Sequence, residues 1–300
     1  MNLRVLDFFS GMGGFSFGFQ KANFQIENGY DHWEVANQTY SKHIGVEAKN
    51  IDISDFFPSK KDYEILIVGG SPCQDFSRLN NSKDIYSKRA QLVLDFCRIV
   101  NSLKPEIFVF ENVIGFPKWG ESALMGIPKY KVSKNIINTK YLGIPQERRR
   151  KIYIGSRNTT IKISNPLIYK IRTVRECLAQ LTENWGFVNH RPPTIEKFSK
   201  VKNTSWHNVE NPDGYEGIIR LNWDSPACAI TNVKKAQILH PSENRVISIA
   251  EALLLQDFPE WYIPEGTDTD KAQQIANAVP PTLSYYLATE IKKRLKKSTI

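Results

Sequence analysis

One stretch near the start of the chain decides the fold: Arg4-Val5-Leu6-Asp7-Phe8-Phe9-Ser10-Gly11-Met12-Gly13-Gly14. Its apolar first half predicts a buried strand, and the glycines that follow predict a tight turn leading into a helix. Glycines in such a turn let the backbone approach a nucleotide-like ligand. The spacing is GxGG, and Ser16 stands where a dinucleotide fingerprint has its third glycine. An adenosine ligand without a pyrophosphate therefore fits this turn better than a dinucleotide does.

The alternation of strand and helix continues through the first half of the chain. Short β-rich runs are expected to form strands at residues 4–9, 25–30, 63–68 and 106–110, with helices from about 14 and at 33–43 and 88–103. This order predicts an α/β fold with a mostly parallel sheet covered by helices on both faces. Later strands are expected at 130–138 and 151–155.

The second half is organised differently. A helical turn at 173–181 leads into a polar stretch from about 185 to 217, which is expected to form loops on a smaller domain. Helical periodicity returns at 247–256 and at 270–293. Within the latter range, the turn Val279-Pro280-Pro281 is expected to precede or kink the final helix.

Composition narrows the class of protein and partner. The formal net charge of +9 favours a polyanionic partner. The four cysteines form no CxxC pair and have no histidine at metal-ligand spacing, so neither a zinc site, nor any other metal site, nor a disulfide framework is expected. No apolar run reaches membrane-spanning length and no signal-peptide pattern is present, so we expect a soluble, cytoplasmic protein without a membrane partner.

Two carboxylates are placed to bind an adenosine ligand. Asp31 ends the second expected strand about twenty residues after Gly11, the usual place of an acid that holds ribose hydroxyls. Asp52 follows the next short run and could accept a hydrogen bond from an adenine amino group. S-adenosylmethionine is the commonest cofactor of this kind, although any α/β protein can carry a glycine turn and acids at strand ends.

Three further segments carry reactive side chains. Cys73 follows the apolar run 65–68, at the carboxyl end of a buried strand, where parallel sheets place reactive groups. A free cysteine is more often a small buried hydrophobe, as we expect for Cys97, Cys177 and the strand-like Cys228. Glu111 ends another strand, either to cap the next helix or to act as an acid. Arg148 and Arg150 share one face of an extended segment, either as a solvated face or as donors to carbonyls and phosphates.

In their order, these motifs resemble those of the DNA (cytosine-5)-methyltransferases. The matching segments are Phe9-x-Gly11-x-Gly13, Pro72-Cys73-Gln74, Glu111-Asn112-Val113, Gln146-x-Arg148-x-Arg150, Arg245 through Glu251 to Gln256, and Asn277-Ala278-Val279-Pro280. Only the polar region before Arg245 lacks a close match, and there the family carries its variable target-recognition segment. The resemblance implies a Rossmann-like S-adenosylmethionine-dependent methyltransferase sheet in a catalytic domain formed by residues 1–160 and 272–300. It implies a second, smaller target-recognition domain at 161–271.

The resemblance also implies a mechanism. Cys73 would add as a thiolate to C6 of cytosine, so that C5 can attack the methyl group of the cofactor. Glu111 would bind and protonate the ring nitrogen N3, and Arg150 would hold the base carbonyl oxygen, with Arg148 supporting it or the phosphate backbone. The base must leave the duplex stack for this chemistry, and the loop at 77–84 would close over it.

Further site residues follow from the same resemblance. The cofactor is expected to contact Phe9, Gly11, Gly13, Asp31, His32, Asp52, Ile53, Pro72, Asn277 and Val279. DNA is expected to contact Gln74, Ser77, Arg78, Asn80, Arg89, Gln146 and Arg191. The chain departs from the family at His32, where many members have a large aromatic residue, and at Ala90 and Ala276, where glycine is frequent.

The function implied is transfer of a methyl group from S-adenosylmethionine to C5 of a flipped cytosine in a short specific sequence of double-stranded DNA. Such an enzyme is expected to be a monomer and the modification enzyme of a restriction-modification system, with a cognate restriction endonuclease acting separately. One alternative is a cytosine-5 methyltransferase of transfer RNA, and another is an inactive DNA-binding relative. A dinucleotide-dependent oxidoreductase is disfavoured by the missing GxGxxG and by the Pro72-Cys73 strand end.

Overall fold

The structure is a computed structural model that describes residues 3–58, 64–71, 88–166, 170–202 and 218–297. The chain forms two compact units. Unit 1 comprises residues 1–137, 149–165 and 281–300, and unit 2 comprises residues 138–148 and 166–280. No helix in the described ranges is long and apolar enough to cross a membrane.

Unit 1 is built on a seven-stranded sheet with the order β3-β2-β1-β4-β5-β7-β6. Its strands are β1 (Arg4–Phe8), β2 (Gln25–Asp31), β3 (Ala48–Asn50), β4 (Ile65–Gly69), β5 (Ile107–Val113), β6 (Lys131–Asn138) and β7 (Arg149–Ser156). The first five strands pair in parallel, and β7 pairs antiparallel with β5. The mostly parallel sheet predicted from the sequence is confirmed.

The strand order creates a switch point between β1 and β4. From β1 the chain moves outward to β2 and β3, and then returns to place β4 on the other side of β1. Phe8 pairs with Gly69, so these two strands end side by side. Ligands of open α/β sheets bind at the carboxyl ends of strands on either side of such a point. The glycine turn after β1 and the segment after β4 both lie there.

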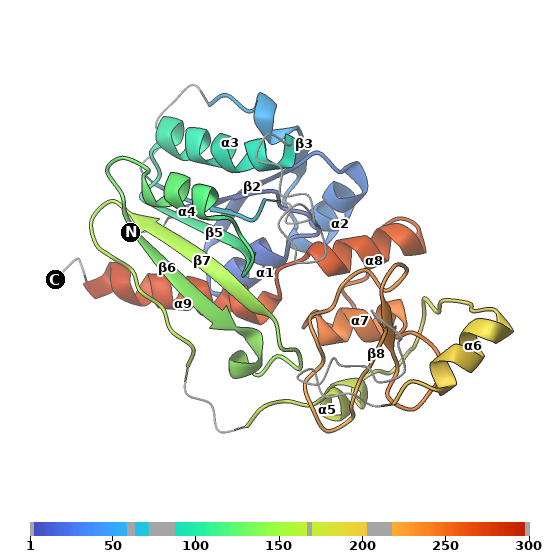
Figure 1. Ribbon diagram of the computed structural model, residues 1–300. Helices are drawn as coiled ribbons and strands as arrows, with labels where there is room; N and C mark the ends of the chain where they lie inside the picture. The colour runs from blue at the N-terminus through green and yellow to red at the C-terminus, as the bar shows by residue number, and fades with distance from the viewer. Residues whose placement is uncertain (1–2, 59–63, 72–87, 167–169, 203–217, 298–300) are drawn as a thin grey trace. The chain divides into compact units, whose positions relative to one another are not determined.

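Helices cover both faces of this sheet (Figure 1). The helical elements of unit 1 are α1 (Gly14–Lys21), α2 (Glu34–Ile44), the 3-10 turn η1 (Ile53–Asp55), α3 (Lys88–Leu103), α4 (Lys118–Met125) and α9 (Pro281–Lys297). Figure 1 shows α3 and α4 together on one face, while α1 and α9 pack against each other. Because a Cβ at Gly18 would lie 2.4 Å from the backbone nitrogen of Tyr285, only glycine permits this close approach of α1 and α9.

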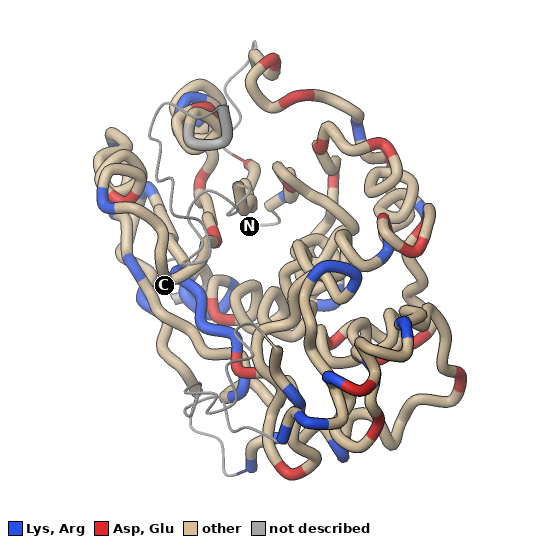
Figure 2. Tube along the Cα trace, turned by 45° about the vertical axis from the view of Figure 1, so that its right-hand side comes forward, with Lys and Arg blue, Asp and Glu red and all other residues tan. Residues whose placement is uncertain are grey.

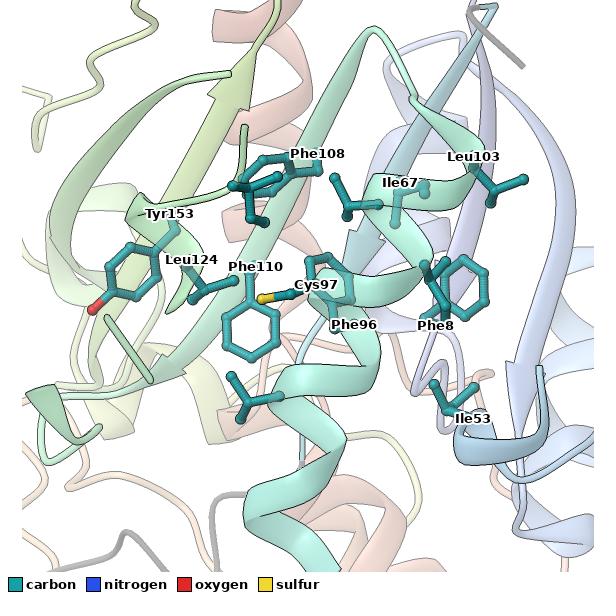
Figure 3. Close-up of a cluster of buried hydrophobic side chains, with 14 of the residues drawn as sticks. Phe8, Ile53, Ile67, Phe96, Cys97, Leu103, Phe108, Phe110, Leu124 and Tyr153 are labelled. Atoms are coloured by element: carbon teal, nitrogen blue, oxygen red, sulfur yellow. The ribbon is translucent and has the colours of Figure 1, made fainter. Parts of the chain in front are cut away.

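An aromatic core lies between α3 and the sheet (Figure 3). Phe96 packs against Phe108 and Phe110 with ring centroids 6.1 and 4.9 Å apart. Cys97 belongs to the same cluster, and burial raises the pKa of its thiol to about 12. The prediction that Cys97 packs in the core is therefore confirmed.

Unit 2 contains short elements around a smaller core. These are the 3-10 turn η2 (Thr139–Leu142), α5 (Val174–Leu178), α6 (Pro192–Ser199), β8 (Ile218–Arg220), β9 (Gln237–Leu239), α7 (Ile249–Leu255) and α8 (Asp268–Asn277). Strands β8 and β9 pair in parallel. Phe198 of α6 packs with Ile218 and Leu239 of these strands in one buried cluster.

Two local predictions about unit 2 were wrong. The stretch from 185 to 217 was expected to form loops, but α6 lies within it, because Pro192 and Pro193 open the helix at positions that need no backbone donor. Residues 203–217 of that stretch lie outside the described ranges. Residues 227–230 around Cys228 form no strand, and a single bridge joins Ala227 to Gln146. Three residues further on, the Ile230 backbone donates to the Gln146 side chain and not to a neighbouring strand.

Candidate functional site

The glycine turn after β1 has an unusual backbone. Phe9, Gly11 and Gly13 all have positive φ, at 57°, 50° and 92°. Glycine adopts such angles freely, whereas Phe9 is a bulky residue held in a strained conformation, a feature that clusters at ligand sites. A Cβ at Gly11 would meet no atom within 4 Å, so open space lies beside this residue. The φ of Gly11 favours glycine, and the absence of a side chain leaves open space beside its backbone.

Asp31 connects this turn to the end of β2. Its Oδ2 accepts a hydrogen bond from the Gly11 backbone nitrogen at 2.9 Å, and its Oδ1 accepts one from Trp33 at 3.0 Å. His32 Nδ1 lies 3.4 Å from Oδ1, and this contact raises the pKa of His32. The sequence placed Asp31 at this turn, and the structure brings the two together.

Asp52 and Ile53 follow β3 at the same edge of unit 1. Asp52 caps η1 by accepting hydrogen bonds from the backbone and hydroxyl of Ser54 at 3.0 and 2.8 Å. Its negative charge adds a smaller contribution than the Asp31 hydrogen bond to the raised pKa of His32. The Ile53 side chain packs in the core beside Phe8, so only its backbone is available to a ligand.

A buried polar chain beneath the turn was missed by the sequence reasoning. Asp7, which is 1% exposed, accepts hydrogen bonds through Oδ2 from the Ser16 hydroxyl at 2.7 Å and the Ser16 backbone at 3.2 Å. The Ser16 hydroxyl also lies 2.7 Å from the Tyr40 hydroxyl. Burial raises the pKa of Asp7 to about 7, against the lowering effect of the Ser16 hydrogen bonds. The available signal was an aspartate inside an apolar strand, followed by a serine in the first turn of the next helix.

Glu111 and Arg150 meet across the antiparallel pair β5 and β7. Arg150 Nε lies 2.7 Å from Glu111 Oε1, and the two side chains are only 11% and 12% exposed. Arg150 also donates from Nη1 to the Arg149 carbonyl at 2.9 Å. A strand end was predicted just before Glu111, but β5 continues to Val113, because its pairing with β7 extends that far.

The segment after β4 runs past this ion pair. A Cβ at Gly70 would lie 3.2 Å from Glu111 Oε2, so the Gly70 backbone passes directly beside the carboxylate. Asn112 donates from Nδ2 to the backbone and hydroxyl oxygens of Ser71, both at 3.3 Å. Pro72 and Cys73, which follow Ser71, lie outside the described residues.

Arg148 and Gln146 point into unit 2. Arg148 donates from Nη1 to the Ile230 carbonyl at 3.2 Å and from Nη2 to the Ala276 and Ala278 carbonyls at 3.3 and 3.4 Å. Gln146 is fully buried and donates to the Leu255 carbonyl and to Gln256 Oε1 at 2.9 and 2.7 Å. Both side chains therefore hold unit 2 together, and Gln146 presents no exposed atom to a ligand.

The last two matched motifs lie in the same unit. Arg245 forms a bidentate ion pair with Glu251, with both N to O distances 2.8 Å. Gln256 donates to the Ala278 carbonyl at 2.6 Å, beside the predicted cofactor residues Asn277 and Val279. Asn277 is exposed at the end of α8, and Val279 is buried.

The residues predicted to contact DNA are only partly described. Arg191 is exposed just before α6. The residues at this site that lie outside the described positions are Gln74, Ser77, Arg78 and Asn80, and Arg89 has only its backbone described, within α3. In the part of the chain that the structure describes, no group of His, Cys, Asp and Glu could hold a metal ion.

Comparison with known proteins identifies the family. The model of the C-5 cytosine-specific DNA methylase family matches residues 3–293. The type II methyltransferase M.HindV of Haemophilus influenzae is 30% identical, over 96% of each chain. The type II methyltransferase M.HgiDI of Herpetosiphon aurantiacus is 28% identical, over 98% of this chain and 96% of its own.

Solved structures support the fold. A candidate DNA modification methyltransferase encoded within an E. coli prophage superposes with a TM-score of 0.79 at 21% identity, over 98% of this chain and 99% of its own. The Dnmt2 methyltransferase of S. pombe gives a TM-score of 0.71 at 22% identity, over 97% of this chain and 99% of its own. The resemblance seen in the sequence and the predicted fold class are both confirmed. The chain belongs to the C-5 cytosine-specific DNA methylase family.

Proposed function

We propose that this protein transfers a methyl group from S-adenosylmethionine to C5 of a flipped cytosine in a short specific DNA sequence. One observation carries the proposal. The Glu111 carboxylate is held 2.7 Å from Arg150 and lies against Gly70, on the segment that leads to Cys73. An acid and a guanidinium fork beside the approach to a cysteine are the groups that addition of a thiolate to a cytosine ring requires.

The residues around the glycine turn fit an adenosyl cofactor. Each Asp31 oxygen accepts one backbone hydrogen bond, and a carboxylate oxygen can accept more than one, so Asp31 is able to bind ribose hydroxyls as well. Open space at Gly11 and the strained backbone of Phe9 adjoin it. S-adenosylmethionine, when bound here, supplies an electrophilic methyl group on sulfur. We propose that Asp52 and His32 border the adenine.

In the proposed reaction, the chain acts on the base from two sides. The Cys73 thiolate forms a bond to C6, and Glu111 delivers a proton to N3 so that the ring carries no full negative charge. Arg150 contacts Glu111 through Nε, and because a guanidinium carries five N–H donors, we propose that another of them donates to the base carbonyl. After methyl transfer, the C5 proton is lost to solvent, the electron pair of the S–C6 bond leaves with sulfur, and N3 returns its proton to Glu111, which regenerates the Cys73 thiolate.

Arg148 has a different role in this proposal. Its guanidinium donates to backbone carbonyls at Ile230, Ala276 and Ala278. We therefore assign it as a positioning residue for the Ala276–Ala278 segment, next to Asn277 and Val279, and not as a group that contacts the base.

The type II relatives suggest the biological setting. We propose that methylation protects DNA against a restriction endonuclease that acts separately on the same sequence, and that the enzyme works as a cytoplasmic monomer. The net charge of +9 is consistent with a polyanionic substrate.

The proposal is tested by incubating the protein with labelled S-adenosylmethionine and either unmethylated phage DNA or transfer RNA. DNA should gain label, Cys73→Ala should abolish it, and Glu111→Gln should slow it by roughly 10²- to 10⁴-fold, the usual contribution of an acid catalyst. Glu121→Gln is the matched control, because Glu121 is another ion-paired carboxylate of unit 1, bound to Lys134 and Lys151. That control should retain methylation.

Two results would contradict the proposal. Label that appears only in transfer RNA would change the substrate, and a Glu111→Gln variant as active as the control would remove Glu111 from the chemistry. Bisulfite sequencing of the labelled DNA then identifies the cytosine that is methylated.

A further inference from the structure

A turn in unit 2 between Ile230 and β9 has a shape set by one residue, Asn232. Its Oδ1 accepts a hydrogen bond from the Lys234 backbone at 2.9 Å. Its main-chain carbonyl accepts from the backbones of Lys235 and Ala236 at 2.9 and 2.7 Å. Its Nδ2 donates to Gln273 Oε1 of α8 at 2.9 Å. Asn232 is 7% exposed, so the turn is held from inside the unit.

Both ends of the turn are also anchored. The Ile230 backbone nitrogen donates to Gln146 Oε1 at 3.1 Å, and the Ile230 carbonyl accepts from Arg148. Val233 is buried, and β9 begins directly after Ala236. The backbone conformation of the turn is therefore established when unit 2 folds, and a ligand that binds to it does not have to order it.

This ordered turn presents two adjacent cations. Lys234 and Lys235 are both exposed, next to the exposed Thr231. Two other exposed lysines have an ion-paired carboxylate within one helical turn, Lys200 with Glu196 and Lys293 with Glu290. Among residues with described positions, no carboxylate forms an ion pair with Lys234 or Lys235. Figure 2 colours the lysines and arginines along the trace blue and the aspartates and glutamates red.

We propose that Lys234 and Lys235 bind two backbone phosphates of the DNA substrate and so fix the position of unit 2 on the duplex. The inference rests on the proposed function, because it concerns the DNA on which that function acts. Lysine is a compact cation on a flexible stem and binds phosphate as a point charge, without reading the base. A rigid turn that carries two such cations supplies affinity and register, and leaves sequence reading to other residues.

The test uses the salt dependence of DNA binding. A pool of short fluorescent duplexes of mixed sequence is titrated with the whole protein, by anisotropy, between about 50 and 200 mM salt. Each phosphate contact contributes about 0.9 to the slope of log K against log salt, so Lys234→Gln/Lys235→Gln should reduce the slope by about 1.8. At about 0.1 M salt, the same relation gives a loss of roughly 60-fold in affinity.

The matched control removes the same charge elsewhere. Lys118→Gln/Lys162→Gln neutralises two exposed lysines of unit 1 and should leave the slope unchanged. Lys234→Arg/Lys235→Arg should restore the wild-type slope, because it keeps both cations. The thermal midpoint of each variant should stay at the wild-type value, because the turn is held by Asn232 and not by the lysine side chains.

Each alternative outcome has a clear meaning. A glutamine variant with the wild-type slope would overturn the phosphate assignment and leave the proposed function intact. So would a control variant whose slope falls as much as that of the glutamine variant. A loss confined to some sequences of the pool would also overturn it, since the lysines would then read bases. A wild-type protein that binds no duplex would contradict the proposed function itself.

Discussion

Replacement of Asp7 by asparagine is expected to change how the stability of the protein depends on pH. Asp7 is buried beneath the glycine turn and accepts hydrogen bonds from the Ser16 backbone and hydroxyl. Burial raises its pKa from 3.8 to about 7. The Oδ1 of asparagine can accept the same two hydrogen bonds, so Asp7→Asn retains the contacts and removes the ionisation.

The sign follows from where the proton binds. Because the pKa of Asp7 is higher in the folded protein, the folded state retains the proton more strongly than the unfolded state. The resulting stabilisation is complete below the unfolded pKa of 3.8 and is lost as pH rises through about 7. At about 1.36 kcal/mol per pKa unit, the whole window corresponds to roughly 4 kcal/mol, of which about 3 kcal/mol falls between pH 5 and 8.

The assay is urea unfolding of wild type and Asp7→Asn at a series of pH values from about 5 to 8, with extrapolation to water. In the difference between the two free energies of unfolding, the contributions of titrating groups that both proteins share, such as His32 and His240, cancel. That difference should move by about 3 kcal/mol in favour of the variant as pH rises. A difference that stays constant across the range would refute the reasoning, because Asp7 would then not titrate there.

A second variant checks the direction independently. The Ser16 hydroxyl lowers the pKa of Asp7, so Ser16→Ala should move the pH-dependent loss of stability to higher pH. A shift to lower pH would contradict the assignment of the hydrogen bond as the opposing influence.

Three other substitutions test the packing and the site. Gly18→Ala places a Cβ 2.4 Å from Ser284 Cβ and from the Tyr285 backbone nitrogen. Urea unfolding should therefore show a free energy of unfolding that is lower by about 3 kcal/mol or more. An unchanged urea midpoint would contradict the close packing of α1 against α9. Arg220 donates to the carbonyls of Phe198, Val201, His240 and Glu243, so Arg220→Lys should lower the free energy of unfolding by roughly 3 kcal/mol, since a lysine cannot reproduce the fork. If calorimetry finds Arg220→Lys as stable as wild type, the hydrogen bonds of Arg220 to these carbonyls do not stabilise unit 2. Phe9→Gly should relieve about 1 kcal/mol of backbone strain while weakening the binding of S-adenosylmethionine. Titration calorimetry that shows an unchanged affinity would contradict a contact between Phe9 and the cofactor.

Several elements were predictable because their signals are local. The apolar runs of β1, β4 and β5 and the periodicity of α3 are visible in short windows of sequence. The glycine turn and Asp31 were predictable as a pair, because parallel strands end at the same edge of a sheet. Helix α6 was missed because a polar stretch with two prolines resembles a loop until Phe198 is seen to be buried.

The candidate site was harder to predict in detail. Arg148 and Arg150 were expected to share one face, with Arg148 supporting the base carbonyl or the phosphate backbone, but Arg148 donates to carbonyls of unit 2 while Arg150 meets Glu111. That contact depends on the antiparallel pairing of β5 with β7, which no nearby residue encodes. The Asp7 chain was missed for a related reason: burial is a property of the assembled unit, and it changes a carboxyl from an ordinary acid to one with a pKa near 7.

Sequence alone was therefore sufficient for the family and the α/β class, because hydrophobic periodicity and the order of the motifs can be recognised along the chain. Folding was needed to decide which of those side chains meet. Glu111 meets Arg150, Gln146 is buried against Leu255 and Gln256, and Asn232 donates to Gln273, all through contacts between segments far apart in the chain. Such contacts arise from strand pairing and packing, whose geometry is not contained in any local pattern of residues.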